Sequence, residues 1–385
     1  MDSPFIYSKP VTGKNFIGRK QDCVILGNLI SQGEHVVLYE PPRSGKTSLV
    51  RQALLNMRMA GTQVVPGQFS VLNIRSVEDF LIRLGSTLVR MVASIPDEYG
   101  EIVSQYLGGT HFVFDRTVFS ETDTVLSLTW DLEPGDMDAV LRLPFRLAAD
   151  KGQRMLLIIT EFQNITLFDG GDTLLRRFAA VLKEARDSGD RGFSYILSGS
   201  SVNAMKDIFE NGFAFSRIVE RVKLSGVDEK EIADHIHKGF LTGGKVTNKD
   251  LLLGASKLLG NNLCYINHFA AICDSMSKGY IMEPVLNDAL DCLIAMHEPC
   301  FRERMNNLTT HQVSLLRAVV DGVTKFSASE VIRKYGLNSS ANVKRVKDAL
   351  MKKEILEFDR QDIPHFLDPL MEYWVKKYFF ETEKG

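Results

Sequence analysis

The chain has 385 residues, of which 44% are hydrophobic and 24% are charged, and its formal net charge is −2. This composition is typical of a globular protein with two or three domains, and it excludes a strong overall attraction to nucleic acid or membranes. The apolar runs are far shorter than a membrane span, and the first ten residues lack the features of a secretory signal. Five cysteines without C-x-x-C spacing favour free thiols, so we expect a cytoplasmic protein without a zinc site or disulfide framework.

The first half of the chain alternates between strand and helix patterns. Apolar runs predict buried strands at 34–40, 124–130, 154–160 and 193–201. Helical periodicity lies between them at 46–61, at 75–95 with Ser76 as N-cap, and at 136–152, where Pro144 should disturb the helix. This alternation predicts an α/β fold with a doubly wound parallel sheet and helices on both faces.

The second half of the chain is helical in its pattern. Four helical segments lie within 228–305, and they predict a small helical domain. Three shorter helices follow within 309–356, each preceded by Ser or Thr, and 357–369 reads as a hairpin. Three helices and a hairpin predict a winged helix-turn-helix. We therefore expect an α/β core at 1–225, a helical lid at 226–304 and a winged helix at 305–385.

The stretch "YEPPRSGKTSLV" at 39–50 is one residue away from the phosphate-binding pattern G-x-x-x-x-G-K-[ST]. Gly45 would let the backbone approach a phosphate, Lys46 would reach the β and γ phosphates, and the Thr47 hydroxyl would hold Mg²⁺. Glu40 replaces the first glycine and should weaken anion binding by repulsion. The other residues predicted to cradle the nucleotide are Pro42, Arg43, Ser44 and Ser48. The alternative is a plain turn between a strand and a helix.

A second incomplete motif ends the strand in "RMLLIITEFQ". In P-loop ATPases such a strand ends in Asp, which holds the Mg²⁺ shell, and a Glu that polarises water often follows. Here the pair is Thr160 and Glu161. Glu161 keeps the ability to polarise water, whereas Thr160 can bind a metal-bound water but brings no negative charge. The alternative is a buried strand that ends in a surface turn.

Together these stretches make the chain similar to the archaeal-type ATPases of the STAND and AAA+ NTPases, a family that also resembles the origin-recognition ATPases. The resemblance rests on motifs in the expected order, and it departs from the family at Glu40 and Thr160. The motifs are "FIGRKQD", "EPPRSGKTSL", "RMLLIITEFQNI", "YILSGSSVNAMKDIF", "FAFSRIVERVKLSGV" and "LTTHQVSLLRAVV" through "FLDPLMEYWVKKY". It implies a P-loop NTPase core, ATP or ADP with Mg²⁺ as cofactors, and a winged helix that contacts double-stranded DNA or protein.

The resemblance also assigns further residues. Ser198 and Ser200 stand where a sensor group would face the γ-phosphate, although a serine pair can also cap the next helix. Arg217 stands where the family has an arginine near the nucleotide, in cis or across a subunit boundary, with Arg221 as the second choice and a surface salt bridge as the alternative. The residues expected to contact or cover the base are Ile17, Gly18 and Arg19.

The last helix of the winged-helix pattern carries a local excess of positive charge. The residues expected to face outward towards phosphates and base edges are Ser339, Ser340, Asn342, Lys344, Arg345 and Lys347. The alternative is a solvated helix on a winged helix that docks a protein.

These observations favour an ATP-dependent regulatory switch with weak or absent hydrolysis, in which nucleotide would clamp the core against the lid and move the winged helix. The first alternative is an active ATPase motor or loader that acts on DNA. The second is a non-hydrolysing scaffold that binds protein or DNA. The sequence leaves open whether ATP is hydrolysed and whether the chain forms homo-oligomers.

Overall fold

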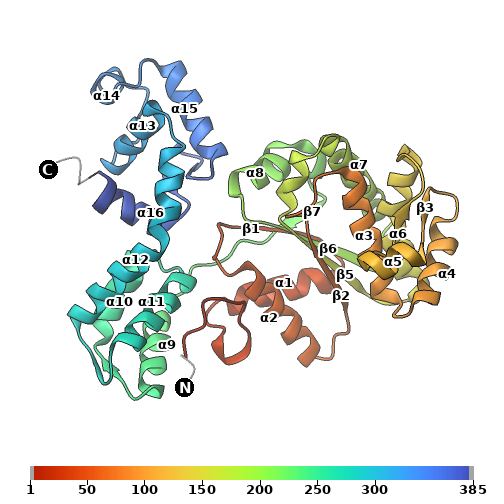
Figure 1. Ribbon diagram of the computed structural model, residues 1–385, viewed down its shortest axis with the longest axis horizontal. Helices are drawn as coiled ribbons and strands as arrows, with labels where there is room; N and C mark the ends of the chain where they lie inside the picture. The colour runs from red at the N-terminus through yellow and green to blue at the C-terminus, as the bar shows by residue number, and fades with distance from the viewer. Residues whose placement is uncertain (1–3, 381–385) are drawn as a thin grey trace. The chain divides into compact units, whose positions relative to one another are not determined.

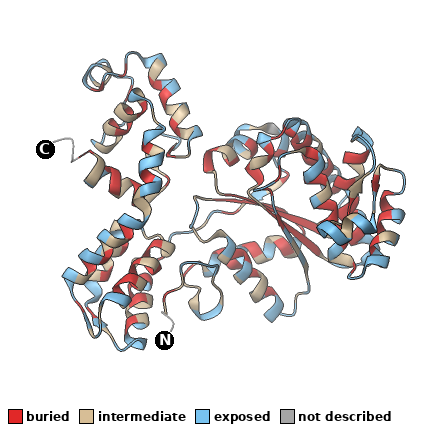
Figure 2. Cartoon of the chain, viewed as in Figure 1, coloured by how far each residue is buried: buried red, intermediate tan, exposed pale blue. Residues whose placement is uncertain are grey.

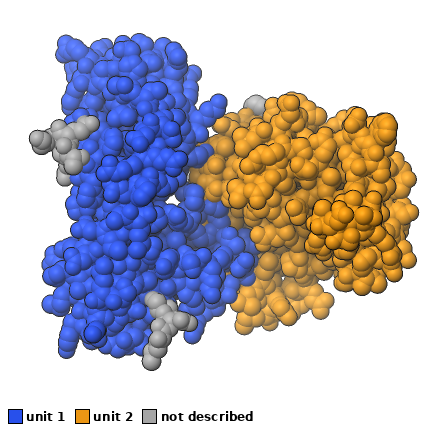
Figure 3. Space-filling view, in the orientation of Figure 1, with its two compact units in different colours: residues 1–20, 41–51, 225–385 blue, residues 21–40, 52–224 orange. Residues whose placement is uncertain are grey.

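The computed structural model describes residues 4–380, which form two compact units (Figure 3). Of the described residues, one unit contains 4–20, 41–51 and 225–380, and the other contains 21–40 and 52–224.

A five-stranded parallel sheet forms the centre of the second unit, in the order β2-β5-β6-β1-β7 (Figure 1). Its strands are β1 (His35–Tyr39), β2 (Val65–Ser70), β5 (Met155–Thr160), β6 (Phe193–Gly199) and β7 (Val219–Arg221). All of β1 and β6 and the first five residues of β5 are buried, as Figure 2 shows in red. These three strands and the α/β fold class are confirmed.

Helices alternate with these strands along the chain. They are α1 (Lys20–Gln32), α2 (Lys46–Met59), α3 (Val77–Val92), α4 (Pro96–Leu107), α5 (Arg116–Thr122), α6 (Pro134–Lys151), α7 (Gly171–Asp187) and α8 (Val202–Lys206). Single-turn segments are η1 (Gly13–Asn15), η2 (Phe162–Leu167), η3 (Asp207–Asn211) and η4 (Phe213–Phe215). Ser76 caps α3 by accepting a hydrogen bond from the Asp79 amide, as the sequence predicts. The interruption expected at Pro144 is absent, because α6 continues through this buried proline.

The strand predicted at 124–130 does not join the central sheet. Only β4 (Ser127–Leu128) forms there, and it pairs with β3 (Phe112–Val113) in a separate antiparallel ribbon. The apolar run is buried for another reason: Leu126 packs directly over Gly85 of α3, where a Cβ would lie 2.0 Å from it. The Ser86 hydroxyl of the same helix accepts the Leu126 amide hydrogen bond that a neighbouring strand would otherwise have taken.

The other unit is mainly helical. Its helices are α9 (Glu229–Thr242), α10 (Lys249–Leu258), α11 (Leu263–Met276), α12 (Glu283–Asn306), α13 (Thr310–Val320), α14 (Ser329–Tyr335), α15 (Ser340–Lys352) and α16 (Pro369–Trp374), followed by η5 (Val375–Phe379). The short strands β8 (Val246–Thr247) and β9 (Tyr280–Ile281), which the sequence did not suggest, pair in parallel.

Helices α13 to α15 and the hairpin of β10 (Leu356–Phe358) and β11 (Pro364–Phe366) form the predicted winged helix. Thr309 and Ser339 cap α13 and α15 as expected. At α14 the expectation of a Ser or Thr cap is wrong, because the N-cap is Ala328.

Candidate functional site

The loop between β1 and α2 is the candidate phosphate-binding turn. Chain order places residues 40–45 directly between the buried strand and a helix of 14 residues that begins at Lys46. Gly45 has a φ of 97°, a conformation that L side chains rarely adopt, and an added Cβ would lie 2.8 Å from Arg19. The sequence therefore has glycine where the backbone conformation of the loop requires it.

Glu40 does not need to be glycine in this structure. The positive φ values of the loop belong to Arg43 and Gly45, at 63° and 97°, and not to Glu40. Its carboxylate accepts a hydrogen bond from the Leu224 backbone amide at 3.4 Å, beside the end of β7. The side chain that departs from the motif thus has a partner of its own in the polypeptide.

The polar groups of the loop suit a bound phosphate. Lys46 Nζ donates a hydrogen bond to the Pro41 carbonyl at 2.9 Å, so the ammonium folds back over the loop. Ser44 Oγ is buried and has no hydrogen-bond partner among the described residues. Thr47 is exposed at the first turn of α2. A helix start, a lysine ammonium and an unsatisfied hydroxyl are donors that phosphate recognition uses.

The N-terminal segment is fastened to this loop through Arg19. Arg19 donates hydrogen bonds to the carbonyl oxygens of Ser44 at 2.6 Å and Ser225 at 2.8 Å. Next to it, the buried Gly18 donates its amide to Glu231 at 2.8 Å and leaves no space for a side chain against Val227. Both residues therefore have structural roles that join the segment before α1 to the loop and to α9.

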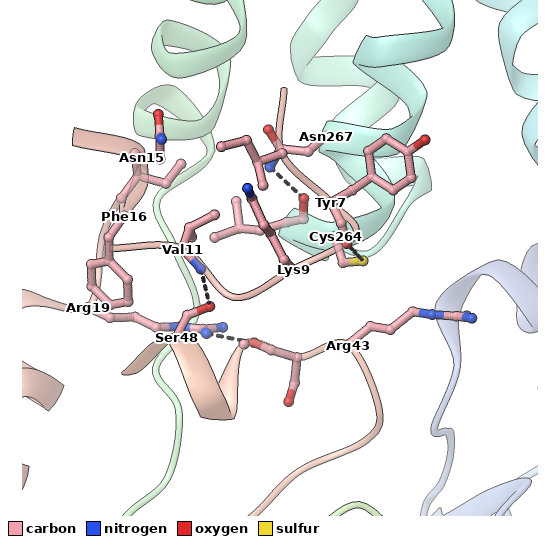
Figure 4. Close-up of a pocket in the computed structure, with 15 residues that line it drawn as sticks. Tyr7, Lys9, Val11, Asn15, Phe16, Arg19, Arg43, Ser48, Cys264 and Asn267 are labelled. Carbon is pink, nitrogen blue, oxygen red and sulfur yellow. Dashed lines mark hydrogen bonds between the residues drawn. The ribbon is translucent and has the colours of Figure 1, made fainter. Parts of the chain in front are cut away.

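A pocket lies between the N-terminal segment, the loop and α11, all within one unit (Figure 4). Six of the residues predicted from the sequence line it, and they are Ile17, Arg19, Arg43, Ser44, Gly45 and Ser48. The predicted residues Gly18, Pro42, Lys46 and Thr47 are not among its lining residues. Ser48 is already engaged, since its hydroxyl accepts a hydrogen bond from the Val11 amide at 3.1 Å.

Arg43 differs from its neighbours in direction. In Figure 4 its side chain extends away from the pocket. Its Nη1 donates a hydrogen bond to the Tyr265 hydroxyl at 3.1 Å instead. The guanidinium expected to add positive charge to the nucleotide cradle is thus bound elsewhere in this conformation.

A second cluster lies at the carboxyl edge of the central sheet. Ser200 donates a hydrogen bond to Glu161 Oε2 at 2.5 Å, and Gln163 donates one to the same oxygen at 2.8 Å. Strand register places Thr160 directly beside the buried Ser198. The structure therefore brings Glu161 and Ser200 together, whereas Ser198 is confined within the strand.

The two arginines after β6 have different surroundings. Arg217 is exposed and has a positive φ of 61°. Arg221 stacks on Tyr39, with its guanidinium carbon 4.1 Å from the ring centroid, and pairs with Glu210. Of the two, Arg217 is the one whose side chain is presented to solvent.

Most of the polar residues predicted on α15 are exposed, but Lys347 is not. Ser339, Ser340, Lys344 and Arg345 are exposed, and Asn342 is half-buried with its amide bound to the Leu337 carbonyl at 3.0 Å. The expectation that Lys347 faces outward is wrong. Only 15% of its side chain is exposed, because it pairs with Asp362 of the wing and its ammonium lies 4.2 Å from the Phe358 ring centroid.

Several of the pocket residues outside the loop were not predicted from the sequence. Tyr7, Lys9 and Val11 come from the N-terminal segment, and Cys264 and Asn267 come from α11. None of these positions belongs to a local motif. Tyr7 and Cys264 are joined by a hydrogen bond across 257 residues of sequence, so only the folded chain reveals the contact.

Comparison with known proteins agrees with this geometry. Residues 299–377 match a family described as "Probable winged helix domain". A Walker-type ATPase of Pyrococcus abyssi has a TM-score of 0.65 at 16% identity, over 95% of this chain and 97% of its own. The chain has the fold of the P-loop ATPases.

Another solved structure supports the same fold. The ORC2 protein of Aeropyrum pernix, in ADPNP and ADP complexes, has a TM-score of 0.59 at 13% identity, over 98% of each chain. The predicted resemblance to archaeal ATPases and the C-terminal winged helix are thus confirmed at the level of fold. No curated protein matches the chain in sequence. Within residues 4–380 no helix is long and apolar enough to cross a membrane.

Proposed function

We propose that the protein is an adenine-nucleotide-dependent regulatory switch of the AAA+ and STAND type, with slow or absent ATP hydrolysis. The observation that carries this proposal is the turn between β1 and α2, where Gly45 has a left-handed backbone and Lys46 folds over the loop. The likeness to the ORC2 protein, which was solved with ADPNP and ADP, supports nucleotide as the ligand. We further propose three domains with the boundaries expected from the sequence, in a cytoplasmic protein.

Each residue of the loop has a defined task in this proposal. Backbone amides of the loop and the first turn of α2 hold the phosphates, Lys46 neutralises them, and the Thr47 hydroxyl holds the Mg²⁺ that accompanies the nucleotide. Ile17, Arg19 and the other pocket residues hold the base and sugar. The unsatisfied Ser44 hydroxyl supports a ligand here, because it lacks a partner among the described residues.

The residues of the second cluster limit hydrolysis. Glu161 is the candidate base for water, but Ser200 and Gln163 both occupy one of its oxygens with hydrogen bonds. Thr160 supplies no charge to a metal shell. Arg217, which is exposed, is the candidate for stabilising charge on the γ-phosphate, in cis or from a second copy.

Nucleotide binding tests the proposal first. Lys46→Ala should weaken the binding of Mg²⁺-ADP by about tenfold to a hundredfold, because it removes a charged hydrogen-bond donor to phosphate. Isothermal titration calorimetry on the full chain would measure this, with Lys20→Ala at the exposed start of α1 as the matched control. Equal dissociation constants for the wild type and Lys46→Ala would contradict the proposal.

The rate of ATP hydrolysis tests the second part of the proposal, which is slow or absent turnover. Wild-type ATP hydrolysis should be slower than about 1 s⁻¹, the low end of ordinary turnover, because Thr160 brings no metal-directed charge. Thr160→Asp, alone or with Glu40→Gly, should raise the rate, and adding Glu161→Gln should lower it again. If the wild type already matches Thr160→Asp in a phosphate-release assay and depends on Glu161, the chain is an active ATPase, the first alternative.

Contact with double-stranded DNA is a second candidate function. The exposed Lys344 and Arg345 lie on α15, which begins at Ser340 after the Ser339 cap. These residue types and their exposure support phosphate contacts from a winged helix. The competing role for the same helix is docking of a protein partner.

A further inference from the structure

Arg43 connects the loop to a buried tyrosine of the helical region. Its Nη1 donates to the Tyr265 hydroxyl at 3.1 Å, and its guanidinium carbon lies 5.6 Å from the ring centroid. Tyr265 belongs to α11, and only 2% of it is exposed. A buried hydroxyl needs both a donor and an acceptor in reach, and Arg43 supplies the donor.

Asp368 supplies the acceptor. The Tyr265 hydroxyl donates to the two carboxylate oxygens of Asp368 at 2.9 and 3.1 Å. Arg43, Tyr265 and Asp368 therefore form a hydrogen-bonded relay with a positive charge at one end and a negative charge at the other. All three belong to the same compact unit.

The last member of the relay also begins a helix of the winged-helix region. Asp368 is the N-cap of α16, and its Oδ1 accepts hydrogen bonds from the amides of Leu370 at 3.0 Å and Met371 at 3.2 Å. One carboxylate thus orients both the relay and the first turn of α16.

A second contact fixes the same place. Gly260, in the turn between α10 and α11, has a φ of 61°, and a Cβ there would lie 2.6 Å from Pro369. The start of α16 therefore packs against a turn that tolerates no side chain. A change in the relay would act on a closely packed junction, which responds as a unit.

The guanidinium of Arg43 has two alternative partners, the neutral Tyr265 hydroxyl of the relay and a phosphate bound in the loop. In the present conformation it is turned from the pocket towards Tyr265 and Asp368, as Figure 4 shows for its direction. A phosphate group held at Ser44 to Lys46 would be an anion a few residues away on the same loop. Since the side chain points away from the pocket, it would have to leave Tyr265 to reach that phosphate, and phosphate and the relay therefore compete for it.

We propose that this relay of Arg43, Tyr265 and Asp368 couples the loop to the winged helix, so that a phosphate in the loop draws Arg43 away and loosens the start of α16. The inference rests on the proposed nucleotide binding and names its regulation. Coupling between two sites is reciprocal. If nucleotide weakens the relay by some factor, a variant whose relay is broken at Asp368 must bind nucleotide more tightly by that same factor.

Calorimetric titration of the full chain with Mg²⁺-ADP tests the coupling. Tyr265→Phe removes only the hydroxyl, and Asp368→Asn keeps a capping oxygen for α16 while removing the charge. Each should bind about fivefold more tightly, which corresponds to one released hydrogen bond. Glu372→Gln, an acid of α16 that pairs with Lys376, is the matched control and should equal the wild type. Equal or weaker binding by both relay variants overturns the proposal.

Hydrogen exchange separates this inference from nucleotide binding itself. In the wild type, Mg²⁺-ADP should speed exchange of the Leu370 and Met371 amides, and in Asp368→Asn this response should shrink. If the wild type binds no ADP, the proposed function fails. The existence of the relay is then tested by hydrogen exchange in the ligand-free protein. There Tyr265→Phe should speed exchange of the same two amides and Glu372→Gln should not. Unchanged exchange in Tyr265→Phe overturns the relay.

Discussion

Tyr39, at the end of β1, contacts two charged side chains just before the loop at 40–45. Its hydroxyl donates a hydrogen bond to Glu210, and Arg221 both stacks on the ring and pairs with Glu210. Burial, followed by the hydrogen bond to Glu210, raises the pKa of Tyr39. The tyrosine therefore stays a neutral donor, and Arg221 balances the carboxylate beside it. These contacts explain why Arg221 is held beside Tyr39.

His35, at the start of β1, makes the stability of the sheet depend on pH. Burial, helped by Arg191 and Arg186, lowers its pKa from 6.5 to about 4. Its Nδ1 accepts a hydrogen bond from the Tyr195 amide at 3.3 Å, which a protonated ring cannot do. The unfolded chain takes up the proton first, so this contribution is complete above pH 6.5 and is lost as pH falls towards 4. The free energy of unfolding should drop by about 3 kcal/mol over that interval.

Urea unfolding at several pH values checks this expectation. His35→Gln should be less stable than the wild type at pH 7, and the difference should narrow by pH 5 because the variant has no proton to gain. The exposed His365 of the wing provides the control substitution, His365→Gln, which should follow the wild type at each pH. A gap between His35→Gln and the wild type that stays constant from pH 7 to pH 5 would exclude His35 as the titrating group.

At the scale of elements, the buried central strands could be predicted from the sequence, whereas the edge strands could not. β1, β5 and β6 are unbroken apolar runs because they lie inside the sheet, with a neighbour on each side. β2 contains Pro66 and Gly67, which weaken any strand pattern, yet it forms because it is an edge strand with a partner only in β5. The apolar run at 124–130 was wrongly predicted to be a strand of the sheet, because Leu126 is buried against a helix and not between strands.

The candidate site likewise has features that depend on neighbours in sequence and features that depend on contacts between distant elements. The turn at 42–48 could be predicted because Gly45 serves it through its own backbone and Lys46 bonds to the nearby Pro41 carbonyl. The contacts of Arg43 with Tyr265, and of Lys347 with Asp362, join distant elements and leave no local pattern. A positive charge in a sequence can be assigned to a helix face, but whether it meets solvent or a neighbouring carboxylate depends on tertiary packing.

At the scale of the whole molecule, the winged helix shares its core with the helical region before it. One apolar cluster includes Phe269 of α11, Phe301 of α12 and Trp374 of α16. Phe301 and Trp374 are in ring contact at 5.8 Å, and the Trp374 indole donates to Glu298 at 3.3 Å. Cutting the chain at 305 would remove Phe301 from this cluster and expose apolar surface, so DNA binding has to be measured on the full chain.

Duplex binding by the full chain should weaken linearly with salt in a log–log plot, because each neutralised phosphate releases counterions. Lys344→Ala and Arg345→Ala should each reduce the slope by about one unit, since both side chains are exposed. Lys347→Ala is the informative contrast. Its ammonium is already paired with Asp362, so its loss should leave the slope unchanged while lowering the stability of the wing. Fluorescence anisotropy at about 50 mM salt, where phosphate contacts are strong, measures all four proteins. If the wild type binds no duplex there, or if Lys347→Ala alone changes the slope, α15 does not meet DNA through its exposed face and protein docking becomes the better account.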